Sequence, residues 1–154
     1  QAARLYWSRT LGRGVGRQPA AGQLIGANAC LDYGYSVLRG HLMRAVLAAG
    51  LAPALGVFHR GRGNAFALAD DLIEPFRPAI DEVALSLPET ASPSDREVKQ
   101  LLVAAASQRF DGDGHGIPAV AEALAQSFGR YVEGDLERLR VLSWQGPSVV
   151  GVGE

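Results

Sequence analysis

The sequence predicts a mainly helical domain, and three observations favour that class. Apolar residues recur at three- and four-residue spacing over long stretches, which places them on one face of an α-helix. The longest such stretch covers residues 24–49. No two segments alternate polar and apolar residues as paired strands do, and the sequence shows no internal repeat. With 154 residues, the chain can bury the core of one ordinary domain.

The apolar spacing predicts where the helices lie. In chain order, we expect them at residues 1–11, 24–49, 64 to beyond 78, 94–108, 118–132 and 135–142. A glycine-rich, irregular tail follows Trp144. We therefore expect a helical domain over residues 1–143 and an irregular tail over 144–154.

The residues between these stripes indicate where the helices begin and end. A basic, glycine-rich loop at 12–17 follows the first helix. Gly50 stands where a left-handed cap ends the second, and Asn64 is a good N-cap for the third. Pro75 and Pro78 lie within the third helix. Each removes an amide donor and crowds the preceding turn, so we expect this helix to bend.

Three glycines interrupt the long helix at 24–49, namely Gly26, Gly34 and Gly40. Glycine weakens a helix interior because it loses more backbone freedom on folding than other residues do. Close packing of another element against this helix would explain their presence.

The charge of the chain gives no global attraction for nucleic acid. Fifteen basic and sixteen acidic side chains leave a net charge of −1, so DNA binding requires local clusters of arginine. Lys99 is the only lysine. Guanidinium is the better bidentate phosphate donor, although an arginine-rich, alanine-rich composition is also typical of GC-rich genomes.

The single cysteine, Cys30, excludes an internal disulfide and a multi-cysteine zinc site. No apolar run approaches the length of a membrane span, and the N-terminus lacks the apolar core of a signal peptide. We expect a cytoplasmic protein without a membrane partner.

The densest group of reactive side chains lies between the second and third helices. An apolar loop carries His59, and the helix that follows carries Asp70, Asp71 and Glu74. Asp71 and Glu74 are three residues apart and share a helix face. Mg²⁺ and Mn²⁺ prefer carboxylates and water, and an imidazole shifts the preference toward Mn²⁺. Together with nearby arginines that could hold a phosphate backbone, this group indicates phosphodiester chemistry: Arg60, Arg62 and Arg77.

Two further interpretations of reactive residues stay open at this point. The residues around His59 alone are also compatible with a loop histidine beside a solvated acidic helix face. A second segment, from Asp111 to Glu122, nearly fits a calcium-binding loop. His115 stands there at an oxygen-ligand position and Pro118 lacks a needed amide, so a polar turn between helices is favoured.

The segments at 50–60 (GLAPALGVFHR) and 64–78 (NAFALADDLIEPFRP) resemble motifs of a known family, the CRISPR-associated spacer integrases (Cas-one). The first segment is similar to the histidine loop of that family. The second resembles its acidic helix, in the form found with type II CRISPR systems. Shorter similarities occur at 28–35, which resembles a packing helix with Asp32 where Asn is usual, and at 2–7 and 126–130.

The resemblance implies roles for individual residues. His59 and Glu74 match two of the three metal ligands of the family and would be its catalytic residues here. Asp71 matches an acidic position one turn before the last ligand and would support the site, as would Asp70. The third ligand would be a glutamate just upstream of Gln1. The resemblance further implies a multi-helix catalytic domain whose N-terminal β-rich partner domain is absent from this chain.

The implied activity is that of a metal-dependent DNA integrase and endonuclease of CRISPR adaptation. A 3′-hydroxyl of incoming DNA would attack a phosphodiester at the boundary of a CRISPR repeat, with Mg²⁺ or Mn²⁺ as cofactor. The implied partners are double-stranded DNA, a second copy of the chain in a homodimer, and the small partner protein Cas-two. Because a third ligand is expected upstream, a catalytically silent helical module that binds DNA or protein stays an alternative.

Overall fold

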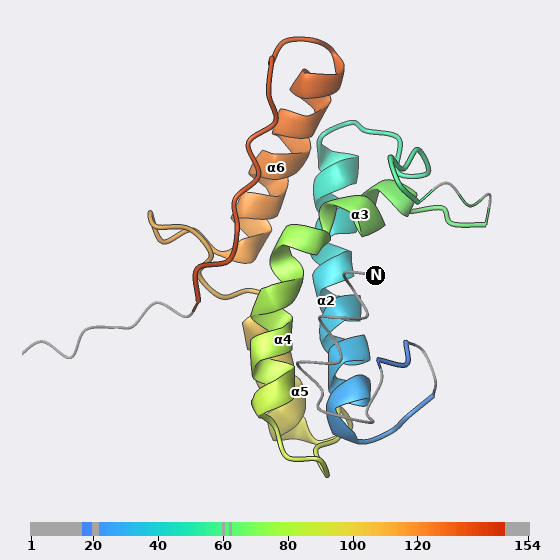
Figure 1. The fold of residues 1–154 in the computed structure, drawn as a ribbon, viewed down its shortest axis with the longest axis vertical. Coiled ribbons are helices and arrows are strands. Elements are labelled where there is room, and N and C mark those ends of the chain that lie inside the picture. The colour runs from blue at the N-terminus through green and yellow to red at the C-terminus, as the bar shows by residue number, and fades with distance from the viewer. Residues whose placement is uncertain (1–16, 20–21, 60, 62, 147–154) are drawn as a thin grey trace, which may run out of the picture.

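The computed structural model describes residues 17–19, 22–59, 61 and 63–146, and this part of the chain is mainly helical (Figure 1). Its elements are α2 (Gly26–Ala48), α3 (Ala67–Leu72), the 3₁₀ helix η1 (Glu74–Phe76), α4 (Arg77–Ser86), α5 (Arg96–Ala105) and α6 (Ile117–Val132). Within the described residues, strand-like pairing is limited to one isolated bridge between Arg109 and Gly116. The expected fold class is therefore confirmed. The helix expected at 1–11 lies outside the described residues.

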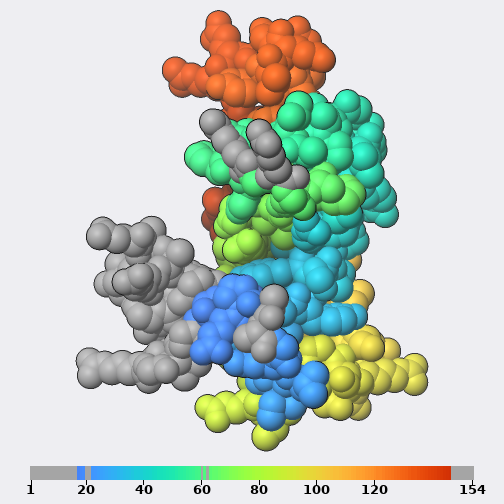
Figure 2. Space-filling model, turned by 90° about the vertical axis from the view of Figure 1, so that its right-hand side faces the viewer, coloured from blue at the N-terminus to red at the C-terminus, as the bar shows by residue number. Residues whose placement is uncertain are grey.

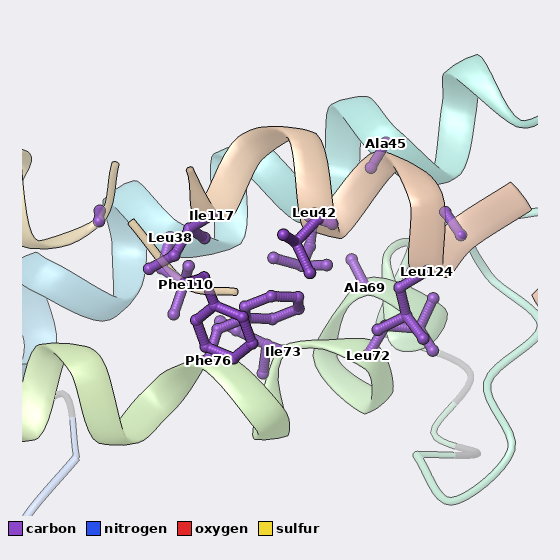
Figure 3. Close-up of a cluster of buried hydrophobic side chains, with 14 of the residues drawn as sticks. Leu38, Leu42, Ala45, Ala69, Leu72, Ile73, Phe76, Phe110, Ile117 and Leu124 are labelled. Atoms are coloured by element: carbon purple, nitrogen blue, oxygen red, sulfur yellow. The ribbon is translucent and has the colours of Figure 1, made fainter. Parts of the chain in front are cut away.

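The long helix α2 forms the centre of the domain and contacts α3, α4, α5 and α6. Its apolar stripe is buried as the spacing predicts, with Leu31, Leu38 and Leu42 fully inaccessible to solvent. Burial of one such side chain contributes about 1.5–3 kcal/mol. Figure 3 shows Leu38 and Leu42 facing Phe76 and residues of α6 in the main core. None of the described helices is long and apolar enough to cross a lipid bilayer.

The two prolines divide the third expected helix into three pieces. Pro75 lies in η1 and Pro78 lies in the first turn of α4, where its missing amide has no helical partner to lose. The chain therefore continues in helical conformation from α3 to α4 but changes direction on the way (Figure 1). Phe76, at the end of η1, is only 1% exposed and anchors the bend in the core.

Close packing explains one of the three glycines of α2. A Cβ atom at Gly34 would lie 2.5 Å from Cγ2 of Ile80 in α4, so the two helices can approach only because residue 34 has no side chain. Gly26 begins the helix with a φ of +82°, a conformation that favours glycine. A Cβ atom at Gly40 would meet no atom within 4 Å, so nothing in the described structure explains that glycine.

The helix expected at 135–142 is wrong. Gly134 has a φ of +86° and ends α6, and the chain then runs back along α6 without helical structure (Figure 1). Leu139 and Leu142 pack against the core from this irregular segment, so their spacing reflects tertiary contact and not a helix face. An isolated helix of this length is marginal in water, and packing decides its conformation.

Trp144 fixes the end of this irregular segment to the domain. Its ring stacks on Phe110 with the ring centroids 5.8 Å apart, and its indole nitrogen donates a hydrogen bond to Glu82 at 3.3 Å. The domain boundary expected after residue 143 stays a prediction.

The two interior glycines of α2 provide a matched test of helix packing. We expect Gly34→Ala to lower the free energy of unfolding by about 1–3 kcal/mol, because the new methyl group overlaps Ile80. Gly40→Ala should instead raise it by about 0.5–1 kcal/mol, since alanine restricts the unfolded chain and meets nothing in the fold. Urea unfolding followed by circular dichroism measures both values, and equal effects of the two substitutions would contradict the packing.

Candidate functional site

The candidate site lies on the loop that joins α2 to α3. Gly50 begins the loop with a φ of +71°, and the amide of Leu51 donates to the carbonyl of Val46 at 3.1 Å, so the expected left-handed cap is confirmed. The amide of Leu68 in α3 donates to the carbonyl of Pro53 at 2.9 Å. Figure 2 shows this loop and α3, in teal and green, on the face turned to the viewer, below the projecting end of α6.

The carboxylate of Asp71 holds the loop in place. It accepts hydrogen bonds from three consecutive backbone amides: Val57, Phe58 at 3.0 Å and His59 at 3.1 Å. It also lies 2.6 Å from Nδ1 of the His59 ring. The Asp71 side chain is only 4% exposed, whereas that of His59 is 51% exposed. One buried carboxylate on α3 thus positions both the backbone and the imidazole of the loop.

The contact with Asp71 determines which ring nitrogen of His59 is available. An ionised carboxylate only accepts hydrogen bonds, so Nδ1 of His59 carries the proton that is shared with Asp71. In the neutral ring, Nε2 then keeps its lone pair. This is the tautomer in which histidine binds a metal ion or accepts a proton.

Gly56 permits this arrangement and was not among the residues expected to serve the site. A Cβ atom there would lie 2.3 Å from the carbonyl oxygen of His59, 2.8 Å from Cβ of Ala67 and 3.0 Å from the Asp71 carboxylate. Any side chain would push the loop off α3. The only sequence signal for this role is the glycine itself, three residues before the histidine.

The pKa of Asp71 reflects two opposing influences. Burial of the side chain raises the pKa, but the hydrogen bonds from the amides of Phe58, His59 and Val57 and from the imidazole outweigh it, and the pKa is lowered. Asp71 therefore remains ionised at neutral pH and retains its acceptor role.

Asp70 makes its hydrogen bonds to α2 and to the end of the loop. Its carboxylate accepts from Nε of Arg39 at 2.5 Å and from the side-chain amide of Asn64 at 2.7 Å. Burial raises its pKa, and these hydrogen bonds lower it further than burial raises it, so the net shift is downward. Asn64 also accepts from the amide of Phe66 at 3.1 Å, and thus supports the loop just before α3 instead of capping the helix itself. Arg39 is a structural partner that the sequence pattern did not indicate.

Glu74 stands one turn after Asp71 and presents its carboxylate to solvent, with its side chain 56% exposed. Its Oε1 lies 3.3 Å from a guanidinium nitrogen of Arg77. The guanidinium carbon of Arg77 lies 4.9 Å from the ring centre of Tyr35, whose hydroxyl donates to the buried Asp81. Arg77 is thus fixed beside Glu74, with 36% of its side chain still exposed.

The expected site residues therefore fall into two groups. The structure places His59 in contact with Asp71, and Glu74 in contact with Arg77, on the loop and the helical turns that follow it. Arg60 and Arg62 lie outside the described residues. The side chains of His59 and Glu74 are of the kinds that bind Mg²⁺ or Mn²⁺. In the described part of the chain, however, His59, Asp71 and Glu74 do not form a set whose ligand atoms all lie within 4.8 Å of one another.

A second group of candidate ligands lies in the turn between α5 and α6. In the part of the chain that the structure describes, Asp111, Asp113 and His115 are the one set of three such residues whose ligand atoms all lie within 4.8 Å of one another. Asp111 accepts from the backbone amide of His115 at 2.7 Å and lies 2.8 Å from its Nδ1. Glu122, the twelfth residue of the near-calcium motif, lies 3.9 Å from Arg44 of α2. These contacts are those of a polar turn.

Comparison with known proteins identifies a family over half of the chain. The family model described as CRISPR associated protein Cas1 matches residues 20–100. A CRISPR-associated endonuclease Cas1 of Neisseria meningitidis is 43% identical over 89 residues, which cover 58% of this chain and 28% of the relative. An endonuclease of the same name from Pyrobaculum aerophilum is 36% identical over 110 residues, 66% of this chain and 35% of the relative. The chain thus spans about a third of these relatives.

A solved structure supports the fold. A casposase bound to an integration product superposes with a TM-score of 0.74 and covers 89% of this chain and 46% of the casposase chain, at 22% sequence identity. The arrangement of helices is therefore shared with that protein.

Replacement of Asp71 tests whether its carboxylate holds the loop. We expect Asp71→Asn to lower the free energy of unfolding at neutral pH by about 1.5–3 kcal/mol. The asparagine side chain has no negative charge, and its NH₂ group would face the backbone amides of residues 57–59, which are themselves hydrogen-bond donors. Because the pKa of Asp71 is lowered in the fold, this contribution is present above its ordinary value of 3.8 and is lost as the pH falls through the folded value. Urea unfolding at neutral and acidic pH measures both effects.

The matched control for this substitution is Asp95→Asn, at the start of α5. Asp95 is exposed and its side chain makes no capping hydrogen bond, so its replacement should leave stability unchanged. Hydrogen exchange at the amides of residues 57–59 should accelerate only in Asp71→Asn. Unchanged exchange there would show that the loop is held by other contacts.

Proposed function

This chain belongs to the CRISPR-associated protein Cas1 family, and from that premise we propose that it carries part of the catalytic site of a metal-dependent DNA integrase. The proposed reaction inserts new spacers into a CRISPR array by attack of a 3′-hydroxyl on a phosphodiester of the repeat. The observation that carries the proposal is the pairing of Asp71 with His59, which leaves an exposed imidazole on the loop that precedes α3 and Glu74.

The chemistry of the donors supports a divalent ion held by His59 and Glu74. Nε2 of His59 has a free lone pair because Asp71 occupies Nδ1. The Glu74 carboxylate is exposed, and it would separate from Arg77 to serve as a ligand. When bound there, Mg²⁺ or Mn²⁺ would polarise the phosphate under attack and stabilise charge on the leaving oxygen.

Arg77 contributes a positive charge that the site needs with or without a metal ion. Its guanidinium is fixed over the Tyr35 ring and lies beside Glu74, so it can bind a phosphate oxygen without a large loss of side-chain freedom. We assign Arg60 and Arg62 the same role on the basis of their places in the sequence, one and three residues after His59.

The remaining parts of the proposal extend beyond the described residues. Two findings support a catalytic domain that acts on DNA: the fold is shared with a casposase, and the relatives are named endonucleases. We propose that a glutamate outside this sequence completes the ligand set, that the protein acts as a homodimer with the small Cas-two protein, and that double-stranded DNA is the substrate. A silent binding module remains the competing proposal, because this chain supplies two of the three expected ligands.

Substitution of the two proposed ligands tests the function directly. The assay measures strand transfer of a labelled DNA into a repeat-containing duplex, by the complete polypeptide that contains this chain, with the small partner and Mn²⁺ or Mg²⁺. We expect His59→Ala and Glu74→Ala to reduce the rate at least about a hundredfold, since removal of a ligand from a metal site costs about 10²-fold or more.

The matched control is His115→Ala, which removes an exposed histidine from the other group of possible ligands. We expect it to retain the wild-type rate and metal requirement. Full activity of His59→Ala, or loss of activity only in His115→Ala, would move the catalytic site away from the loop. A folded, partner-bound protein without strand transfer in any buffer would favour the silent binding module.

A further inference from the structure

The loop that carries His59 also exposes an unusual amount of apolar surface. Phe58 is 85% exposed, the highest value among the large apolar side chains of the described residues, and Leu55 is 73% exposed. Both lie outside the two hydrophobic clusters of the domain. An exposed aromatic side chain is a common anchor of binding sites, because its burial in a complex is favourable.

The backbone of Phe58 is fixed although its side chain is exposed. Its amide and those of Val57 and His59 all donate to the buried Asp71 carboxylate. The side chain therefore projects from a held backbone position, with little ordering cost when it enters a ligand.

The loop that carries Phe58 also has a surface that can receive a flat group. A shallow hollow of about 640 Å³ opens between the two arms of the loop and is lined by residues that include Leu55, Gly56, Gly63 and Ala65. Among the residues that the structure describes, those that line the hollow carry no charge. Glycine and alanine edges let a flat group approach the backbone closely.

His59 directly follows Phe58 in the chain, and this favours DNA over a protein partner as the occupant. Consecutive Cα atoms lie about 3.8 Å apart, so a phosphodiester that reaches His59 brings the adjoining bases within reach of the Phe58 ring. The His59 side chain is itself 51% exposed. A protein seated on Phe58 would also cover His59 and close the proposed site to its substrate.

We propose that Phe58 is a positioning residue that inserts between bases at the step next to the phosphodiester under attack in the target DNA. This inference rests on the proposed function of His59. Apolar wedges of this kind unstack a base step and kink the duplex, which exposes the backbone at that step. The phosphodiester would then turn toward His59 while the displaced base rests against the hollow lined by Leu55.

Two targets that differ only at the integration step test the wedge. One target is fully paired, and the other carries a mismatch at that step, which lowers the cost of unstacking. For the complete polypeptide with its small partner, we expect Phe58→Ala to slow integration into the paired target at least about tenfold, as loss of base–aromatic stacking does elsewhere. Integration into the mismatched target should recover to within about threefold of wild type.

The controls separate a wedge from a structural role. Phe58→Trp should retain activity on both targets, and Leu101→Ala, which removes an exposed apolar side chain of α5, should behave as wild type. A 2-aminopurine base placed at the integration step should brighten on binding of wild type and not of Phe58→Ala, whether or not strand transfer follows.

Either of two results would overturn the wedge. Wild-type rates of Phe58→Ala on the paired target would show that the ring does not act, and an equal loss on both targets would show that it supports the protein instead. Failure of the proposed function would look different, because wild type would then transfer no strand into either target while the 2-aminopurine signal still reported on Phe58.

Discussion

The site depends on one buried carboxylate. Asp71 accepts hydrogen bonds from three consecutive loop amides and from the imidazole of His59. Hydrogen bonds to an ionised acceptor are stronger than neutral ones, and their concentration on one side chain makes the loop conformation depend on that charge. A loop with several glycines and exposed apolar residues would otherwise have little to fix it. Backbone placement, ring orientation and tautomer thus share a single cause.

Contacts between α3, α2 and the core hold the helix that carries this carboxylate. Asp71 belongs to α3, whose neighbouring Asp70 is ion-paired with Arg39 of the central helix α2. Behind it, Phe76 at the proline bend is buried in the main cluster, as Figure 3 shows. The bend allows α3 to carry the loop while α4 packs against α2 at Gly34. Secondary structure, core and site are therefore linked through a few specific contacts.

The sequence predicted most of the helices and the central place of α2, because burial of an amphipathic stripe follows directly from apolar spacing. It failed at 135–142, where leucines at helical spacing pack from an irregular segment that only tertiary contact with α6 and the core determines. The density of reactive side chains and then the family resemblance both pointed to His59, Asp71 and Glu74, whose roles stay a prediction, whereas the family itself is confirmed. The type II form of the family stays a prediction. Arg39 and Gly56 were missed, since their roles arise from contacts between distant residues.

The central claim is that Asp71 presents Nε2 of His59 as a metal ligand. Pulsed electron paramagnetic resonance of Mn²⁺ bound to the complete polypeptide tests it most directly, because a coordinated imidazole nitrogen modulates the echo of the metal. The account predicts nitrogen modulation in wild type and in His115→Ala, and its loss in His59→Ala. Modulation that persists in His59→Ala would contradict the claim and place the metal on another histidine.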